Sequence, residues 1–507
     1  MSKAKIFLAC LIWLILLGTA VSIYRLWLVP REEAKKEQQQ AQVVEATSGS
    51  SNYQHTVRVG LDGFTGYAVL RSAELKQELR GRGIKLELVD DSADYTNRMQ
   101  SLATGNVHLA AFPIDALLKT SAAIGKTPAT IIAILDETRG ADAIVAYKER
   151  FPDINSLNSP ETRILYVGDS PSETLVRVLK QKFDLTAMTS QSLVPLASEA
   201  ELLRRYKSAR PGGDEVFATW EPVVSQMKQN PAMHVLTDTS KETGFIIDSL
   251  VANRDYLVKN DTVVQDFLES YFRALYAIND GDGLKGLVRS DAQAASMRLD
   301  AAQVEALADG IEWKNTQENF AHFGLRNASV VLVEDMIDRI TRLLIQSGTL
   351  QSDPTIGQPS RLFYEKPLAD LQAAGFHPGV NAEAVREQEQ LPQLTVGQWE
   401  RLVPVGAAQV PPLIYARGTS KLTESSKVKL DELVENLASW PRYYLMVRGN
   451  ASRRGNEEAN RQLARSRAEA ALQYLLSKGI PAEKMKVMDG ELSGQTSVTF
   501  VLGQPPY

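Results

Sequence analysis

The stretch TVRVGLDGFTGYAVLRSAELKQELRGRGIKLELV spans residues 56–89 and decides the fold class. Its first six residues alternate apolar and polar side chains, which predicts a half-buried strand. Residues 67–79 follow with helical spacing, and residues 85–89 have the pattern of a second strand. Since a strand, a helix and another strand form the unit of parallel α/β sheets, we expect an α/β domain here.

The same alternation of strands and helices continues for about 200 residues beyond this stretch. Further strands are predicted near residues 107–112, 130–135, 143–146, 164–167, 216–219 and 245–252. A helix is predicted at residues 95–103, and from residue 262 to about 347 the apolar spacing is helical throughout. Residues 55–350 are therefore expected to form one large α/β domain.

The N-terminal segment predicts membrane insertion. An apolar run from Ile6 to about Tyr24 follows two lysines and approaches the roughly 20 residues that a bilayer core requires. Small residues at 18–20 leave cleavage by a signal peptidase as an alternative. We expect residues 1–30 to be one uncleaved transmembrane helix in a bacterial inner membrane, with the rest of the chain in the periplasm.

Three further segments complete the predicted domain organisation. Residues 31–54 lack apolar periodicity and predict a flexible linker. Residues 351–403 are richer in Pro, Gly and Gln and predict a connector. Residues 404–507 are expected to form a separate small α+β domain, with a strand at 443–447 and a long helix at 457–476.

Composition argues against several classes of function. A net charge of −5 lacks the basic footprint that nucleic-acid binding needs. The single cysteine, Cys10, allows neither an intrachain disulfide nor a cysteine-ligated zinc site. The five histidines are scattered, and the sequence contains no H-E-x-x-H, G-x-S-x-G or Walker-type motif. We therefore expect a protein that is not an enzyme and holds no cofactor or metal.

The order of motifs from residue 56 to about 350 resembles the periplasmic substrate-binding proteins of the nitrate, sulfonate, taurine and thiamine-precursor group. The stretches that carry this resemblance are VGLDGFTGY (59–67), NRMQSLATGNVHLAAFPIDAL (97–117), AILDETRGADAIVA (133–146), GDSPSETL (168–175) and EVFATWEPVVSQ (215–226). The resemblance implies two lobes that close over a small-molecule solute. It also implies hinge crossings near residues 142–146 and 244–251.

Each of these stretches places a strand end beside a loop or helix, which is where open α/β sheets bind ligands. The side chains expected to line the cleft are Asp62, Phe64, Thr65, Tyr67, Phe112, Arg139, Asp142, Asp169, Ser170, Ser172, Trp220 and Glu221. Helix N-termini at such strand ends suit an anion. The four carboxylates among these residues would instead repel an oxyanion and favour a cationic or neutral solute. Both alternatives stay open.

Three of these residues also have simpler interpretations. Ser170 and the glutamate three residues later would form a capping box, and capping is the expected sole role of that pair. Trp220 could be an ordinary packing residue between the lobes. Arg139 would pair either with an anion or with a neighbouring carboxylate, Asp136 or Glu137.

Residues 404–507 resemble the OmpA-like domain, which ties envelope proteins to peptidoglycan. The stretch GNASRRGNEEANRQLARSRAEAA (449–471) carries the resemblance. Its residues that match the family pattern are Gly449, Gly455, Asn460, Leu463, Arg467 and Ala468. In the family, a loop Asp and a helix Arg hold the zwitterionic end of diaminopimelate. Here Ser452 stands in place of that Asp, and Asn450 in place of a loop His.

This substitution predicts weakened or altered peptidoglycan binding by Asn450, Ser452, Asn460 and Arg467. Asn460 and Arg467 are seven residues apart and share one helix face, so Arg467 could still bind a peptide carboxylate. Ser452 offers a hydrogen bond but no charge. Losing such a charge-assisted bond costs about 1.5–3 kcal/mol, or roughly tenfold or more in affinity. Pairing with an acid of its own helix is the alternative for Arg467.

Together these features predict a membrane-anchored envelope protein that binds a small solute between two lobes and associates with the cell wall. A second possibility is the substrate-binding receptor of an ABC transporter, which would deliver solute to a permease. A third is an envelope scaffold whose cleft binds no solute and which docks a protein partner.

Overall fold

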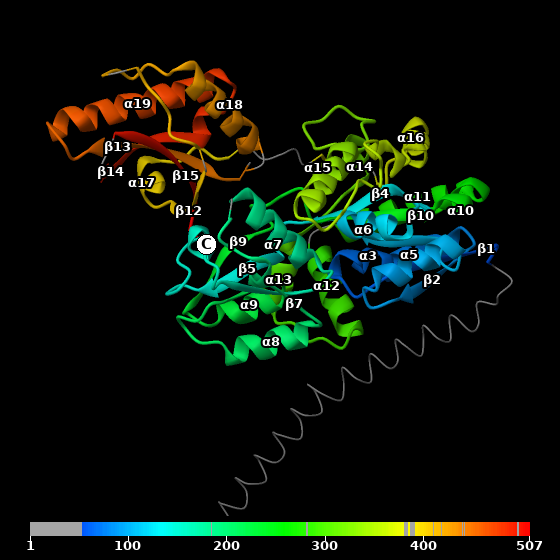
Figure 1. Cartoon of the computed structure of the whole chain (residues 1–507). Coiled ribbons are helices and arrows are strands. Elements are labelled where there is room, and N and C mark those ends of the chain that lie inside the picture. Colours follow the sequence, from blue (N-terminus) through cyan, green and yellow to red (C-terminus); the bar gives the residue numbers. More distant parts are fainter. Residues whose placement is uncertain are drawn as a thin grey trace, which may run out of the picture. The chain divides into compact units, whose positions relative to one another are not determined.

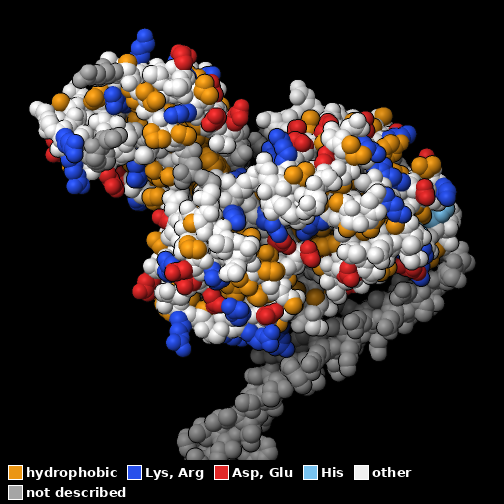
Figure 2. Space-filling model, viewed as in Figure 1, with side chains coloured by type: hydrophobic (Ala, Val, Ile, Leu, Met, Phe, Trp, Pro, Cys, Tyr) orange, Lys and Arg blue, Asp and Glu red, His pale blue; other side chains and the backbone are white. Residues whose placement is uncertain are grey.

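In a computed structural model, the chain is described over residues 53–506, except residues 184, 280–281, 380–383, 386–390, 409, 417, 439, 441 and 494–495. The predicted transmembrane anchor (1–30) and nearly all of the predicted linker (31–54) lie outside these residues. Among the described helices, none is both long and apolar enough to cross a membrane. Acidic and basic side chains are interspersed on the face visible in Figure 2.

The first lobe is built on a six-stranded sheet with the order β11-β4-β10-β3-β1-β2. β1 and β3 are parallel, whereas β10 runs antiparallel to both β3 and β4. β4 and β10 are buried along their whole length, as is typical of strands covered on both faces. The strands are β1 (His55–Leu61), β2 (Ile84–Asp90), β3 (Leu109–Pro113), β4 (Ala129–Thr138), β10 (Ile247–Asn253) and β11 (Ile311–Trp313).

Helices and short 3-10 turns surround this sheet. They are η3 (Thr65–Tyr67), α3 (Ala68–Arg71), α4 (Ala73–Gly81), α5 (Tyr95–Thr104), α6 (Ile114–Ile124), α10 (Arg254–Lys259), α11 (Asp261–Ile278), α12 (Gly283–Ala294), α13 (Ala301–Gly310), α14 (Thr316–His322), α15 (Val333–Gln346), η6 (Pro359–Arg361) and α16 (Lys366–Ala373). α16 packs against α11, and Phe363 forms a bridge with Ile131 of β4, so the start of the predicted connector lies on this lobe.

Two elements of this lobe differ from the sequence prediction. The predicted helix over residues 67–79 is broken at Ser72, because the hydroxyl of Ser72 accepts a hydrogen bond from the backbone N–H of Leu75 and begins α4. β11 lies in the region predicted to be helical throughout. It forms because Ile311–Trp313 pairs with the edge of β4, a long-range contact that local spacing does not reveal.

The second lobe is built on a five-stranded sheet with the order β7-β6-β8-β5-β9. β6 is parallel to β7 and β8, and β5 is antiparallel to β8 and β9. Its strands are β5 (Asp142–Tyr147), β6 (Arg163–Val167), β7 (Leu193–Leu196), β8 (Glu215–Trp220) and β9 (Met233–Asp238). Its helices and turns are η4 (Ile154–Leu157), α7 (Pro171–Lys182), η5 (Ser190–Ser192), α8 (Glu199–Ser208) and α9 (Val223–Lys228).

The chain crosses between the lobes twice, at residues 139–141 and 239–246. Both crossings begin a few residues before the predicted hinge positions. They are joined to each other, since the backbone N–H of Gly140 donates to the Thr239 hydroxyl (2.7 Å) and that of Thr239 to the Asp142 carbonyl (2.9 Å). Gly140 has φ of 118°, a conformation that favours glycine.

The last domain has a four-stranded sheet with the order β12-β15-β13-β14, and α19 packs on it (Figure 1). Its elements are α17 (Val396–Glu400), β12 (Val403–Ala408), α18 (Glu424–Ala438), β13 (Tyr444–Ser452), α19 (Glu457–Ser477), η7 (Ala482–Lys484), β14 (Met485–Ser493) and β15 (Ser497–Gln504). Side chains of β13 alternate between two faces. Leu445 and Val447 join the core of α18 and α19, while Tyr444 and Met446 pack with Trp399 of α17.

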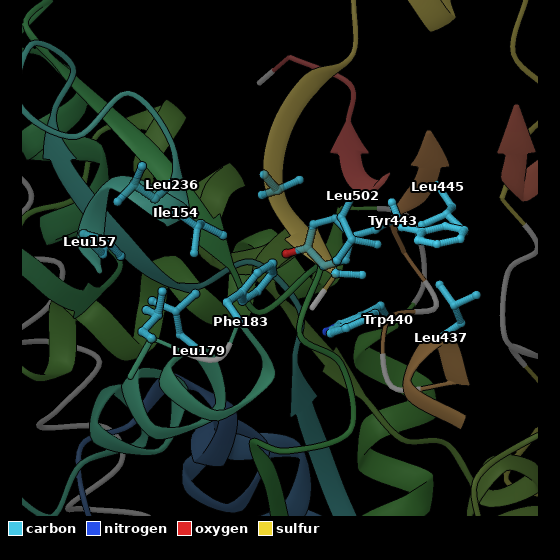
Figure 3. Packing of buried hydrophobic residues seen from close by; sticks show 14 of the residues in the cluster. Ile154, Leu157, Leu179, Phe183, Leu236, Leu437, Trp440, Tyr443, Leu445 and Leu502 are labelled. Atoms are coloured by element: carbon cyan, nitrogen blue, oxygen red, sulfur yellow. The ribbon is translucent and has the colours of Figure 1, made fainter. Parts of the chain in front are cut away.

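One hydrophobic core runs from the second lobe into the last domain (Figure 3). Phe183, which follows α7, packs against the rings of Trp440 and Tyr443 at centroid distances of 6.2 and 6.1 Å. The hydroxyl of Tyr443 also donates to the buried carboxylate of Glu242 (2.9 Å), in the second crossing between the lobes. The last domain is therefore packed directly against the hinge region.

Candidate functional site

Five buried carboxyl groups lie where strands of the two lobes end. They come from the ends of β1, β3 and β4, the start of β10 and the start of β5. We call them the interlobe acidic cluster: Asp62, Asp115, Asp136, Asp142 and Asp248, each 6% exposed or less. Burial raises the pKa of Asp248 to about 8, and the charges of Asp62, Asp115 and Asp142 act in the same direction. Acids from both lobes therefore face one another.

On the first lobe, Arg98 of α5 balances part of this charge. Its fully buried guanidinium pairs with Asp62 (2.8 Å) and Asp91 (2.5 Å) and donates to the carbonyl of Ala111 (2.6 Å). The guanidinium also lies 5.4 Å from the ring centre of Phe112, a predicted cleft residue. Asp62 is therefore held by a cation of its own lobe.

The loop after β1 brings aromatic residues to the same edge. The Tyr67 hydroxyl donates a hydrogen bond to the Asp248 carboxyl, and the ring of Phe64 stacks edge-on against Tyr67 at 5.3 Å. Burial strongly raises the pKa of the Tyr67 hydroxyl, with the charge of Asp248 adding to the effect. Thr65 begins the 3-10 turn that positions Tyr67. The structure thus places Asp62, Phe64, Thr65, Tyr67 and Phe112 together.

On the second lobe, three predicted residues meet at one strand edge. Asp142 begins β5 directly opposite Trp220, the last residue of β8. The hydroxyl of Ser172, in the first turn of α7, donates to Asp142 (2.8 Å). Burial raises the pKa of Asp142 to about 7, although the hydrogen bond from Ser172 opposes this shift. The sequence prediction of a shared edge for these residues therefore agrees with their positions.

The two lobes touch directly through α6 and α7. The hydroxyl of Thr174 in α7 donates to Asp115 in α6 (2.7 Å), and both side chains are buried. At the rim, Lys119 lies 3.4 Å from Asp115 and 3.7 Å from the exposed Asp169 of the other lobe. These contacts join α6 of the first lobe to α7 of the second beside the interlobe acidic cluster.

The predicted capping box at Ser170 and Glu173 is wrong. The hydroxyl of Ser170 donates to the carbonyl of Val167 (2.6 Å) and makes no side-chain cap to α7. Glu173 instead accepts from the backbone N–H of Asp169 (2.8 Å) and pairs with Arg177. The reason is that the last carbonyl of β6 lies within reach of the serine hydroxyl and satisfies it first.

Glu221 and Arg139 are engaged outside the interlobe acidic cluster. The carboxylate of Glu221 accepts from both the backbone and the hydroxyl of Ser225, and so caps α9. Arg139 lies in the first crossing and pairs with Glu137 (3.2 Å) and Glu312 (3.0 Å), rather than with Asp136. Burial alone would raise the pKa of Glu137, but the charges of Lys314 and Arg139 lower this pKa to about 2.

Sequence reasoning missed four residues at this site: Arg98, Asp115, Asp136 and Asp248. A signal was present for two of them, since Asp136 in ILDET and Asp248 in IIDSL each interrupt an apolar strand. A lone acid in a strand buried on both faces must have a charged partner, a proton or a ligand. Arg98 gave no such signal because it lies on a helix of ordinary composition.

In the last domain, a loop follows β13 and precedes α19. The amide of Asn460 donates to the carbonyls of Ser452 (3.0 Å) and Arg454 (2.8 Å), and the Ser452 hydroxyl accepts from the backbone N–H of Arg454 (3.1 Å). Gly455 has φ of 90°, which favours glycine. Asn460 therefore fixes the loop. The Asn450 side chain lies at the sheet, where it donates to Thr499 (3.1 Å).

Arg467 lies two turns further along α19 than Asn460. Its Nε donates to the carbonyl of Thr419 (3.0 Å), and the guanidinium lies 4.8 Å from the ring centre of Tyr415. The described contacts of Arg467 are thus with the segment before α18, whereas Glu457 of its own helix pairs with Arg461. Arg467 is half-buried, so part of its guanidinium faces solvent.

Residues 414–498 match the OmpA family. The resemblance predicted for the last domain is thereby confirmed. This OmpA-like domain is 29% identical over 76 residues to the peptidoglycan-associated lipoprotein of Rhizobium meliloti (strain 1021), covering 15% of this chain and 43% of that protein. It is 35% identical over 72 residues to the protein of the same name from Agrobacterium fabrum (strain C58), covering 13% of this chain and 41% of that protein. The chain thus spans less than half the length of these relatives.

The two-lobed domain is similar to solved structures of periplasmic binding proteins. The alkanesulfonate-binding protein from Xanthomonas axonopodis pv. citri matches with a TM-score of 0.47 and 15% identity, covering 62% of this chain and 99% of that chain. The nitrate-binding protein from Synechocystis PCC 6803 matches with a TM-score of 0.47 and 14% identity, covering 63% of this chain and 88% of that chain.

Proposed function

We propose that this chain is an envelope protein with two binding functions. Its two-lobed domain binds a small solute between the lobes, and its OmpA-like domain associates with peptidoglycan. In this proposal, residues 1–30 anchor the chain in the inner membrane and the remainder lies in the periplasm. The observation that carries the proposal is the interlobe acidic cluster, which five separate strand ends build and two lobes enclose.

Solute binding is supported by the energetic cost of this cluster. A buried carboxyl group that lacks a partner destabilises the fold, so such groups are usually absent unless they serve a function. The hydrogen bond from Thr174 to Asp115 is a polar contact across the lobes, which suits a closure that opens for ligand entry.

A thermal-shift screen of the chain tests solute binding. At a solute concentration of about 100 times Kd, binding to the native state adds about 2.7 kcal/mol and raises the unfolding midpoint. The panel contains amines, amino acids, sulfonates and oxyanions. The shift should shrink in Asp142→Ala and persist in Asp370→Ala, because Asp142 is buried between the lobes whereas Asp370 is exposed on α16. If no compound in the panel raises the unfolding midpoint, the result would favour the alternative of an envelope scaffold that binds no solute.

Wall association is supported by the position of Arg467. A guanidinium binds a carboxylate through two parallel hydrogen bonds. The guanidinium of Arg467 lies over the ring of Tyr415, which holds it in place. The neighbouring loop is rigidly fixed by Asn460. Ser452 already uses its hydroxyl to accept a hydrogen bond within the loop, so it offers an ammonium group less than an aspartate would.

We expect Arg467→Ala to reduce retention on purified peptidoglycan about tenfold or more, because a charge-assisted hydrogen bond contributes about 1.5–3 kcal/mol. The matched control is Arg461→Ala, which removes an arginine of the same helix that is paired with Glu457. In the reverse direction, Ser452→Asp should raise retention by a similar factor. Equal retention of all four proteins in a pull-down assay would refute wall binding at this site.

A further inference from the structure

Two members of the interlobe acidic cluster form a close pair. Asp136 of β4 and Asp248 of β10 stand directly opposite each other in the antiparallel register. Side chains at opposite positions of antiparallel strands have Cβ atoms about 4.5–5.5 Å apart and point to the same face of the sheet. The two side chains are 0% and 1% exposed. One small group placed between them could therefore contact both carboxyls.

Three of the four oxygens of this pair lack a hydrogen-bond partner within the described part of the chain. These are both oxygens of Asp136 and Oδ2 of Asp248. The fourth, Oδ1 of Asp248, accepts from the Tyr67 hydroxyl. Close to Asp136 lies the hydroxyl of Tyr271, which is also fully buried and has no hydrogen-bond partner among the described residues. Buried polar atoms in native proteins are nearly always satisfied, so this group of atoms is suited to binding a hydrogen-bond donor.

The surroundings of the pair are acidic. The titratable and charged groups that act on it from the neighbouring elements are Asp62, Tyr67, Tyr95, Asp115, Glu137, Asp142, Tyr271 and Lys314. Burial and the charge of Asp248 raise the pKa of Asp136 well above its usual range, and burial raises that of Asp248 to about 8. Without a ligand, the pair therefore keeps a proton at neutral pH.

We propose that the Asp136–Asp248 pair binds a primary ammonium group of the solute, and that the bound cation replaces the proton held by the empty pair. This inference rests on the proposed solute-binding function and names its chemical class. A primary ammonium has three N–H donors and no acceptor, which matches the three open carboxyl oxygens. The positive charge enters as the proton leaves to solvent, so the net charge of the site is unchanged. Lys314, the cation among the groups named above, is already paired with Glu137 and Glu312 and is therefore not available to an anion.

The test uses isothermal titration calorimetry of the chain near pH 7 with putrescine and ethanolamine as primary-ammonium probes. Choline, a quaternary ammonium without N–H donors, and nitrate serve as comparison ligands. Titration in two buffers of different ionisation enthalpy counts the protons released. We expect a primary amine to bind, to release up to one proton and to bind more tightly as the pH rises through about 8. Choline should bind at least tenfold more weakly, and nitrate not measurably.

Two variants locate the binding. Asp136→Asn and Asp248→Asn should each weaken amine binding at least tenfold, whereas Asp266→Asn, which alters a partly exposed pair with Arg82, should bind as the unaltered chain does. If one Asn variant does not fold, the other variant alone decides whether the pair binds the amine. The inference is overturned if amines bind the Asn variants equally, or bind without proton release. Tight binding of nitrate or another anion between the lobes would overturn it while leaving the proposed solute binding intact. If none of the four probes binds, the inference is overturned, and the thermal-shift panel of amino acids and sulfonates then decides the proposed solute binding.

Discussion

Replacing Arg98 by methionine is expected to lower the free energy of unfolding by about 3–5 kcal/mol. The Arg98 side chain is fully buried, and its guanidinium pairs with Asp62 and Asp91. Methionine fills similar space without charge, so both carboxylates would remain buried with no cation. The loss of stability therefore comes from two buried carboxylates without a cation rather than from a cavity. Urea unfolding followed by circular dichroism measures it.

Arg82→Met is the matched control. Arg82 also pairs with two acids, Asp266 and Glu269, but its side chain is 25% exposed. Exposed ion pairs contribute only about 0–1 kcal/mol, so the control should lose little stability. Adding Asp62→Asn to Arg98→Met should recover part of the lost stability, because it removes one of the two buried carboxylates without a cation. Similar losses at Arg82 and Arg98, or no recovery in the double variant, would show that burial of the ion pairs does not decide stability.

The second large effect is a fall in stability with rising pH that depends on Asp142. Burial raises the pKa of Asp142 to about 7, whereas an unfolded chain releases this proton near pH 4. Between these values the native state binds more protons, so the free energy of unfolding decreases as pH rises. At about 1.4 kcal/mol per pH unit, the loss approaches roughly 4 kcal/mol above pH 7.

Asp142→Asn removes this titration while keeping an acceptor for the Ser172 hydroxyl. Relative to the unaltered chain, we expect the variant to be similar in stability near pH 4 and more stable by several kcal/mol above about pH 7. Asp169→Asn serves as control, because Asp169 is exposed whereas Asp142 is buried. A difference for Asp142→Asn that stays constant from about pH 4 to pH 8 would contradict the assignment.

The site was predictable where local sequence places a residue at a strand end. Six predicted residues lie at the interlobe edge because each begins, ends or follows a strand, or lies in the first turn of a helix after one: Asp62, Tyr67, Phe112, Asp142, Ser172 and Trp220. Arg139 was assigned to the same edge, but its position in a crossing segment gives it Glu137 and Glu312 as partners. Glu137 is a local partner, whereas Glu312 belongs to β11, which follows about 170 residues later and which sequence order could not place beside Arg139.

The same division holds in the OmpA-like domain. The glycines and the helix pattern were enough to predict the fold and the shared helix face of Asn460 and Arg467. The two residues nevertheless differ in role. Asn460 uses its amide to hold the backbone of the loop, while Arg467 leaves part of its guanidinium to solvent beside Tyr415.

Sequence analysis was sufficient to predict the α/β class of the two-lobed domain, the order of most strands and helices along the chain, and the resemblance of the last domain to OmpA. These follow from apolar periodicity and from motifs of a few residues, which are local properties. Three contacts became visible only in the fold: Asp136 faces Asp248, Arg98 pairs with Asp62, and Tyr443 of the last domain donates to Glu242 at the hinge. Those contacts join residues 36 to 201 positions apart, and their energies depend on burial and strand register, which no local pattern encodes.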